Sequence, residues 1–191
     1  MEYGFFAFLS RVKYIRRWGL MRNTRDENLA EHTLETAMLS HALAIVGNRV
    51  FQKDLNADRA ATLAIFHDAT ETITGDMPTP VKYFSPEIKA AFDGVDAVAK
   101  EKLLAMLPSE LQSDYADVFY FDGDEYLKKL IKAADTLSAY IKCIEERLAG
   151  NKDFLKAERS IKKRLLGYSL PEVDYFLEKF IPAYEKTVDE M

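Results

Sequence analysis

A histidine and two carboxylates stand close together in the apolar segment AIFHDATE. His67 and Asp68 are adjacent, and Glu71 follows three residues later. Successive residues of an α-helix turn by about 100°, so all three side chains would share one sector of a helix. A divalent cation would remove the cost of burying such carboxylates, because imidazole nitrogen and carboxylate oxygen bind zinc, manganese, iron and cobalt. The alternative is a surface pair with a solvated Glu71, since an isolated His-Asp pair is common.

Two further positions carry residue types that bind metals. Asp135, in IKAADTLSAYI, stands in the least charged part of a long predicted helix, where its alternative role is an ion pair with Lys132. His32, in NLAEHTLETA, falls in the first turns of another predicted helix, where a lone histidine is more often structural. His41 lies about half a turn round that helix from His32, so we interpret it as a core or partner-bonded histidine.

The order His32, His67-Asp68, Asp135 resembles the H…HD…D pattern of the HD-domain metal-dependent phosphohydrolases, which are all-α enzymes. The stretches RRWGLMRNTRDENLAEHTLE, FHDATETITGDMPTPVKYF and IKAADTLSAYIKCIEE are similar to the bacterial 5′-deoxynucleotidases of that superfamily. The resemblance covers nearly the whole chain, and it implies one HD-type domain over residues 1–191 that forms a homodimer. One departure is Gly19, where the family pattern has proline and where glycine loosens the backbone.

The resemblance implies hydrolysis of a 2′-deoxyribonucleoside 5′-monophosphate to a deoxynucleoside and phosphate through a metal-activated water. The implied metal ligands are His32, His67, Asp68 and Asp135. Binuclear members of the superfamily need further histidines, and the sequence has none between Asp68 and Asp135. We therefore expect one divalent ion, of the cobalt, manganese or zinc type, because sequence alone does not rank these metals.

Residues near the expected ligands suit the remaining roles. Glu71 is predicted to be a general acid or base, and Asp76 to orient the nucleophile or protonate the leaving oxygen. Arg17 suits the phosphate, because a guanidinium offers a planar pair of donors. Trp18 suits a wall against the sugar, with a core aromatic as its alternative role. The predicted substrate-binding residues are Arg17, Trp18, Asp76, Thr79 and Lys82.

Two other functions remain open from the sequence. One is an HD phosphohydrolase acting on nucleoside di- or triphosphates or on pyrimidine-analogue monophosphates. The other is a non-catalytic helical module that keeps the metal for stability, although such a module would not need Glu71 or Asp76. Phosphate release from a deoxynucleoside monophosphate, compared with release from a triphosphate, distinguishes the deoxynucleotidase from the other HD phosphohydrolases. Metal-dependent turnover distinguishes it from the non-catalytic module.

The elements expected to position these residues are all helical. Apolar residues recur at three- and four-residue spacing, and no segment alternates with period two for the length of a strand. Asn28 and Glu31 form a capping-box pattern, and Asn56 can cap a helix that runs to Gly75. We expect an all-α bundle of seven or eight helices, at about residues 5–15, 28–45, 56–75, 85–106, 109–119, 125–148, 153–166 and from 169, with a break at Pro182. The apolar stripe of the second helix is predicted to be Leu34, Ala37, Met38, Ala42 and Ile45.

Composition narrows the class of protein. The chain has 191 residues, 48% of them hydrophobic, which suits a globular domain, and no apolar run approaches the length of a membrane span. The net charge of -5 argues against a binding surface for nucleic acid polymers. Residues 1–25 are nonetheless mainly basic, and they could hold a small anion or be solvated. The single cysteine, Cys143, excludes an internal disulfide and favours a cytoplasmic protein.

Overall fold

The computed structural model describes residues 2–121 and 123–191, and within these residues it is built from helices. One isolated antiparallel bridge joins Arg16 and Asn28. The α-helices are α1 (Phe5–Leu9), α2 (Leu29–Val50), α3 (Ala57–Phe66), α4 (Glu71–Thr74), α5 (Thr79–Lys82), α6 (Pro86–Ala105), α7 (Ser109–Tyr120), α8 (Glu125–Leu148), α9 (Leu155–Gly167) and α10 (Pro171–Lys179). Short 3-10 turns cover Ser10–Tyr14, Lys152–Phe154, Ile181–Glu185 and Val188–Glu190.

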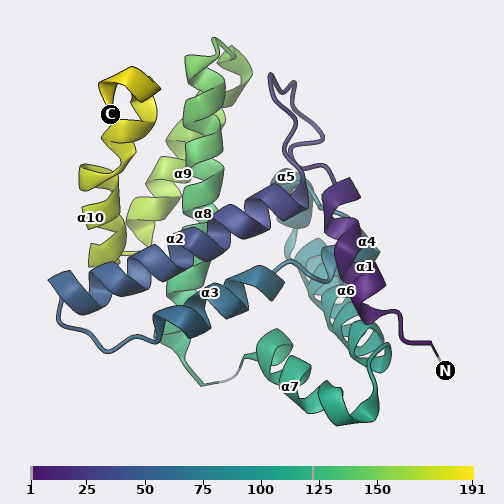
Figure 1. Cartoon of the computed structure of the whole chain (residues 1–191). Helices are drawn as coiled ribbons and strands as arrows, with labels where there is room; N and C mark the ends of the chain where they lie inside the picture. Colours follow the sequence, from purple (N-terminus) through teal and green to yellow (C-terminus); the bar gives the residue numbers. More distant parts are fainter. Residues whose placement is uncertain (1, 122) are drawn as a thin grey trace.

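The two longest helices, α2 and α8, cross at the centre of the molecule (Figure 1). Helix α3 lies alongside α2, α9 packs beside α8, and α10 packs against α2 and α9. Leu43 of α2, Leu137 and Ile144 of α8 and Leu165 of α9 are fully buried in the largest core cluster. This packing holds the N-terminal part of α2 against the middle of α8, and these segments carry His32 and Asp135.

The predicted helix starts are confirmed where they depend on local capping. The Asn28 side chain accepts hydrogen bonds from the N–H groups of Ala30 and Glu31, and Glu31 reaches back to the Asn28 N–H. Asn56 caps α3, and Ser85 caps α6. Each cap satisfies N–H groups that have no partner inside the helix, so it needs no tertiary contact.

Two predicted helices are divided in the structure. The first ends as an α-helix at Leu9 and continues as a 3-10 turn to Tyr14. The third ends at Phe66, and residues 67–70 form a turn before α4. The reason lies in the His67 ring, whose Nδ1 lies 2.6 Å from the Ala64 carbonyl oxygen. A continuing helix would use that carbonyl to accept from the N–H of residue 68.

The predicted apolar stripe of α2 is wrong for most of its members. Leu34 and Met38 are 62% and 58% exposed, and Ile45 is also exposed, whereas Ala37 is buried. The buried face of α2 instead carries small and polar residues between its leucines. Its members include His32, Thr36, Leu39, Ser40, Leu43, Ala44 and Gly47. Small residues allow α3 and α8 to approach closely, so the largest apolar side chains do not mark the buried side.

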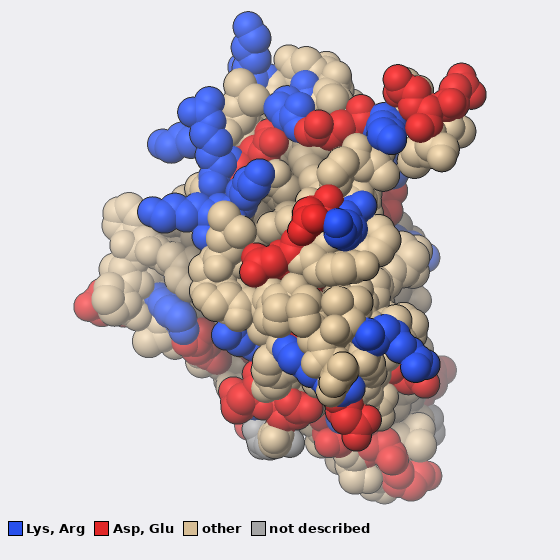
Figure 2. Space-filling model, turned by 90° about the vertical axis from the view of Figure 1, so that its left-hand side faces the viewer, with Lys and Arg blue, Asp and Glu red and all other residues tan. Residues whose placement is uncertain are grey.

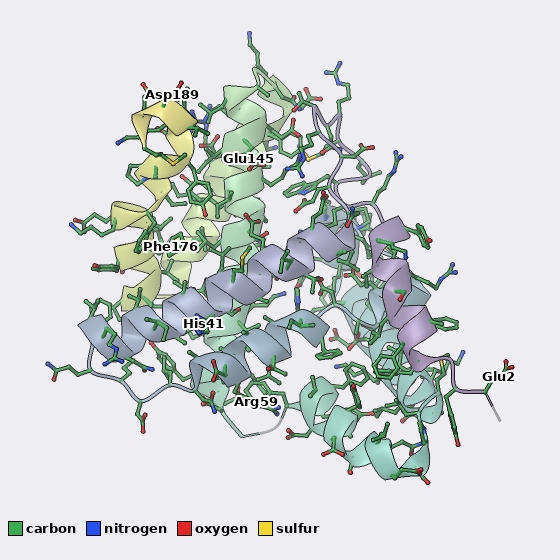
Figure 3. The ribbon with its side chains drawn as sticks, in the orientation of Figure 1. Glu2, His41, Arg59, Glu145, Phe176 and Asp189 are labelled. Carbon is green, nitrogen blue, oxygen red and sulfur yellow. The ribbon has the colours of Figure 1, made fainter. Side chains whose placement is uncertain are left out.

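His41 is not a core histidine. It lies on α2 next to the segment of α3 that carries Arg59 (Figure 3). Its Nε2 is 3.8 Å from a carboxylate oxygen of Asp58, and both side chains are exposed to solvent. His41 therefore stays outside the group of potential metal ligands.

Acidic and basic side chains both lie on the surface of the molecule (Figure 2). On the face shown in Figure 2, acidic and basic side chains are interspersed, and several lysines and arginines gather in its upper left part. None of the described helices is long and apolar enough to cross a membrane. This face offers no continuous basic surface of the kind that binds nucleic acid polymers.

Candidate active site and metal centre

Four predicted ligands from three parts of the chain meet at the crossing of α2 and α8. His32 Nε2 lies 3.2 Å from Asp135 Oδ1 and 3.5 Å from Asp68 Oδ2. His67 Nε2 lies 2.9 Å from the same Asp68 oxygen. His32, His67 and Asp135 each offer one ligand atom within 4.8 Å of the others, and one Asp68 oxygen lies close to both histidines. Bonds of about 2.0–2.2 Å to one ion would place neighbouring ligand atoms roughly 3.0–3.5 Å apart, so the arrangement fits one divalent ion.

The ring of His67 presents a lone pair to the site. Its Nδ1 donates to the Ala64 carbonyl, so Nε2 carries no hydrogen in the neutral ring. Nε2 is buried without a hydrogen-bond partner among the described residues, although Asp68 lies beside it. Burial lowers the pKa of His67, but Asp68 outweighs burial and raises it. A proton or a cation is therefore needed between this nitrogen and the Asp68 carboxylate.

His32 is oriented by two residues that the sequence analysis did not identify. Ser138 donates its hydroxyl hydrogen to Glu35, at 2.6 Å, and its oxygen lies 3.0 Å from His32 Nδ1. The serine oxygen therefore accepts from Nδ1–H and leaves Nε2 free to bind a metal. Ser138 is 106 positions from His32, and only the crossing of α2 and α8 brings the two side chains together.

Asp135 pairs with Lys132 and also faces His32. Its Oδ2 accepts from Lys132 Nζ at 2.7 Å, and its Oδ1 faces His32. Burial raises the pKa of Asp135. Lys132 and His32 outweigh burial, so the pKa of this carboxyl group lies well below its usual range. For Asp68, burial likewise raises the pKa, while His67 and His32 outweigh burial and lower it. Both carboxylates are therefore ionised, as metal ligands must be.

Glu71 and Asp76 differ from these ligands in their protonation. Burial, followed by the charges of Asp68 and Asp76, raises the pKa of Glu71 to about 9. The pKa of Asp76 is also raised by burial, although Arg17 partly offsets the effect. Glu71 Oε2 is buried and has no hydrogen-bond partner among the described residues. The site thus contains ionised carboxylates beside Glu71, whose raised pKa favours the protonated form, and such a separation of pKa values is typical of an acid–base site.

The predicted substrate residues line a cavity of about 470 Å³ beside the metal ligands. Arg17 and Trp18 lie on one side of it, and Asp76, Thr79 and Lys82 lie on another. Arg17 Nη1 is 3.9 Å from Asp68 Oδ2, and its Nε is buried without a hydrogen bond. A second cavity, of about 430 Å³, opens toward α6 and α7 and shares Asp68, Glu71, Lys82 and Asp135 with the first.

Trp18 lies between the core and the cavity. Its ring packs on Phe154 at a centroid distance of 5.2 Å, which joins it to the core. The same residue lines the cavity next to Arg17. Gly19 sets no constraint of its own, because a Cβ added there would meet no atom within 4 Å. The position of the indole therefore depends on the contacts that the Trp18 side chain makes, and not on a steric restraint at Gly19.

Comparison with known proteins identifies the relatives of this chain. The family described as "5′-deoxynucleotidase YfbR-like" matches residues 4–184. A 5′-deoxynucleotidase of Yersinia pestis (strain Pestoides F) is 49% identical over 190 residues, which cover 98% of this chain and 95% of the relative. A 5′-deoxynucleotidase of Yersinia pseudotuberculosis serotype O:1b (strain IP 31758) is identical to the same extent.

Solved structures share the fold. An HD-domain phosphohydrolase from Listeria innocua superposes with a TM-score of 0.82 at 20% identity, covering 94% of this chain and 87% of that one. A cyanophage S-2L HD phosphohydrolase, bound to dA and one catalytic Zn²⁺ ion, superposes with a TM-score of 0.66 at 19% identity. It covers 95% of this chain and 96% of the phage protein. The family match and the curated relatives show that this chain, which has the fold of solved HD-domain phosphohydrolases, is a member of the YfbR-like 5′-deoxynucleotidase family.

Proposed function

We propose that this protein is a metal-dependent 5′-deoxynucleotidase, which converts a 2′-deoxyribonucleoside 5′-monophosphate and water to a deoxynucleoside and phosphate. The observation that carries the proposal is the meeting of His32, His67, Asp68 and Asp135 beside a cavity lined by Arg17. Membership of the family and the names of its curated members support the same reaction.

We propose His32, His67, Asp68 and Asp135 as the ligands of one divalent ion. The two histidines are neutral and the two carboxylates are ionised, so the site as a whole balances the charge of the ion. When bound, a divalent ion supplies an activated water and polarises the phosphoryl oxygens. Zinc is favoured by the phage structure with its catalytic Zn²⁺, while cobalt and manganese suit the same donors.

The remaining residues act on the water and the phosphate. Glu71, whose buried Oε2 has no other partner, exchanges a proton with the attacking water. Asp76, whose pKa is raised by burial and partly lowered again by Arg17, would orient the water or protonate the leaving oxygen. The guanidinium of Arg17 would bind the phosphate, because Arg17 lines the cavity together with Thr79 and Lys82. Phosphoryl transfer asks mainly for positioning and charge neutralisation, which these groups provide.

Phosphate release from a panel of nucleotides tests the function. We expect turnover of deoxynucleoside monophosphates that depends on added Zn²⁺, Mn²⁺, Co²⁺ or Mg²⁺, with little phosphate from dATP. Preferential hydrolysis of dATP would instead favour a triphosphate hydrolase. Absence of turnover with every metal, in protein that binds the metal, would favour the non-catalytic module.

Trp18→Ala is expected to reduce discrimination between deoxyribose and ribose. With Arg17 on the phosphate, the adjacent indole fills the space that a 2′-hydroxyl would need. Rejection of one added hydroxyl by apolar packing is worth about 10²-fold, so we expect strong but incomplete preference for dAMP over AMP in the wild type. The variant should lower the ratio of kcat/KM for dAMP to kcat/KM for AMP, chiefly by raising kcat/KM for AMP.

The control for this experiment is Arg17→Ala, which should weaken both substrates alike because both carry the phosphate. A dAMP-to-AMP ratio that is the same in wild type and Trp18→Ala would assign the indole to the core alone. Selection of the sugar would then rest on other residues of the cavity.

We also propose that the chain forms a homodimer through the exposed apolar face of α2. Leu34, Met38 and Ile45 recur at helical spacing and share this face, although they are exposed in the single chain. Replacing Leu34 and Met38 together by glutamate should halve the mass measured by sedimentation velocity. Val98→Glu, at an exposed apolar position on α6, serves as the control. A monomeric wild type would contradict the proposal.

A further inference from the structure

Trp18 adopts a backbone conformation that bulky residues rarely adopt. Its φ angle is +59°, in the left-handed region. This conformation costs a non-glycine residue of order 1 kcal/mol and persists only where the surroundings enforce it. The following residue, Gly19, contributes no steric restraint. The position of the indole in the cavity therefore depends on contacts from elsewhere in the chain.

Glu27 supplies those contacts for both substrate residues. Its Oε2 accepts the indole N–H of Trp18 at 2.6 Å and lies 3.5 Å from Arg17 Nε. Its main-chain carbonyl accepts the Arg17 N–H at 2.9 Å. The Glu27 side chain is only 11% exposed, so its charge is poorly screened by water. One carboxylate thus holds the phosphate-facing arginine and the sugar-facing tryptophan in a single arrangement.

The hydrogen bond fixes the rotation of the indole. Indole has one donor and no acceptor, so a single partner at Nε1 determines which edge of the ring turns inward. Phe154 supports the ring through an aromatic contact. Without the Glu27 oxygen, packing on Phe154 alone would let the ring slide or turn. A loosely held indole would move aside for the 2′-hydroxyl of a ribonucleotide, and the preference for deoxyribose would decrease.

The rest of the loop is fastened independently of Glu27. The Glu146 carboxylate accepts hydrogen bonds from the Thr24 N–H and hydroxyl, from Asn151 and from Lys142. Burial raises the pKa of Glu146, but Lys142, Asn151 and Thr24 outweigh burial and lower it to about 2. These bonds tie the loop to α8 at Thr24, which follows Arg17 and Trp18 in the sequence. Loss of Glu27 should therefore free the indole and the guanidinium while the loop stays attached.

We infer that Glu27 is a positioning residue that sets the preference for deoxyribose by holding Trp18, and that it aligns Arg17 with the phosphate. The inference rests on the proposed function for its substrate. Glu27 touches no reacting atom in this assignment. Its two contacts are separable, because the indole needs only an oxygen acceptor, whereas the guanidinium responds to the negative charge.

Two variants separate these contacts. Glu27→Gln keeps an oxygen acceptor for the indole but removes the charge beside Arg17. We expect the kcat/KM ratio of dAMP over AMP to stay near the wild-type value, while KM rises for both substrates. Glu27→Ala removes both contacts, so the ratio should fall by about tenfold or more, a large part of the discrimination that apolar packing supplies. Asp26→Ala, at the exposed neighbouring carboxylate, is the matched control and should change neither quantity.

Trp18 is the only tryptophan in the chain, so its fluorescence reports the indole without any substrate. Glu27→Ala should lower the steady-state anisotropy and shift the emission to longer wavelength, whereas Glu27→Gln and Asp26→Ala should resemble the wild type. Circular dichroism and thermal unfolding establish that each variant is folded. If Glu27→Ala does not fold, the Gln variant still tests the charge on Arg17 through KM.

The outcomes distinguish this inference from the proposed function. A wild type that hydrolyses dAMP, with the same ratio and anisotropy in Glu27→Ala, would overturn the role of Glu27 alone. A KM for dAMP unchanged in Glu27→Gln would overturn the alignment of Arg17. A wild type that hydrolyses no deoxynucleoside monophosphate would overturn the proposed function, while the fluorescence would still decide whether Glu27 holds the indole.

Discussion

Asp135→Ala is expected to abolish metal binding and phosphate release together. The variant removes one of two carboxylates that would balance the charge of the ion, and it leaves Lys132 beside the site without its partner. Changes to groups that merely support metal ligands cost about 10–100-fold in metal affinity or activity, so loss of a ligand should cost more. The measurement is metal content after dialysis, together with kcat for dAMP.

The matched control for this variant is Asp58→Ala. Asp58 is also a helical aspartate near a histidine, but its side chain is almost fully exposed and far from the proposed ligands. Its loss should leave metal content and turnover unchanged. If Asp135→Ala retains one equivalent of metal and near-normal turnover, Asp135 serves only as the ion-pair partner of Lys132, and the proposed set of ligands is wrong.

Glu71→Ala should produce the opposite combination. We expect the variant to retain the metal but to lose roughly two or more orders of magnitude in kcat, the usual contribution of a positioned acid or base. Glu71→Gln keeps the shape of the side chain but cannot exchange a proton, so it should show nearly the same loss. Metal analysis and single-turnover phosphate release are the measurements.

The pair of glutamate variants also tests the coordination scheme. Metal loss from Glu71→Ala would make Glu71 a ligand and leave the acid–base role to Asp76. Substantial activity in Glu71→Gln would show that no proton passes through this carboxyl group. Retained metal with low kcat in both variants, beside the metal-free Asp135→Ala, would separate the residue that moves a proton from the residue that binds the ion.

The sequence by itself determined the helical class and most helix boundaries. Asn28, Asn56 and Ser85 cap the helices that they were predicted to cap, and Gly75 ends α4 with a positive φ angle. These features depend on hydrogen bonds between residues a few positions apart, so the local sequence predicts them. The spacing of metal-type residues likewise indicated which side chains could take part in the chemistry.

Only the tertiary structure decided which face of α2 is buried. Leu34 and Met38 are exposed, whereas Thr36 and Ser40 are fully buried. Both sides of this helix carry apolar residues, so periodicity does not choose between them. The choice depends on how closely α3 and α8 can approach, and small residues on one side permit a closer approach than leucine and methionine on the other.

For His32 the orientation was decided by contacts between distant segments, whereas for His67 and Trp18 it was decided by partners three and nine positions away. Ser138 and Glu35 select the nitrogen that His32 presents, the Ala64 carbonyl ends α3 so that His67 turns inward, and Glu27 holds Trp18. A residue type and its spacing show what a side chain can bind. The direction in which it points depends on partners that packing brings close, for His32 more than a hundred positions away, and no local pattern specifies them.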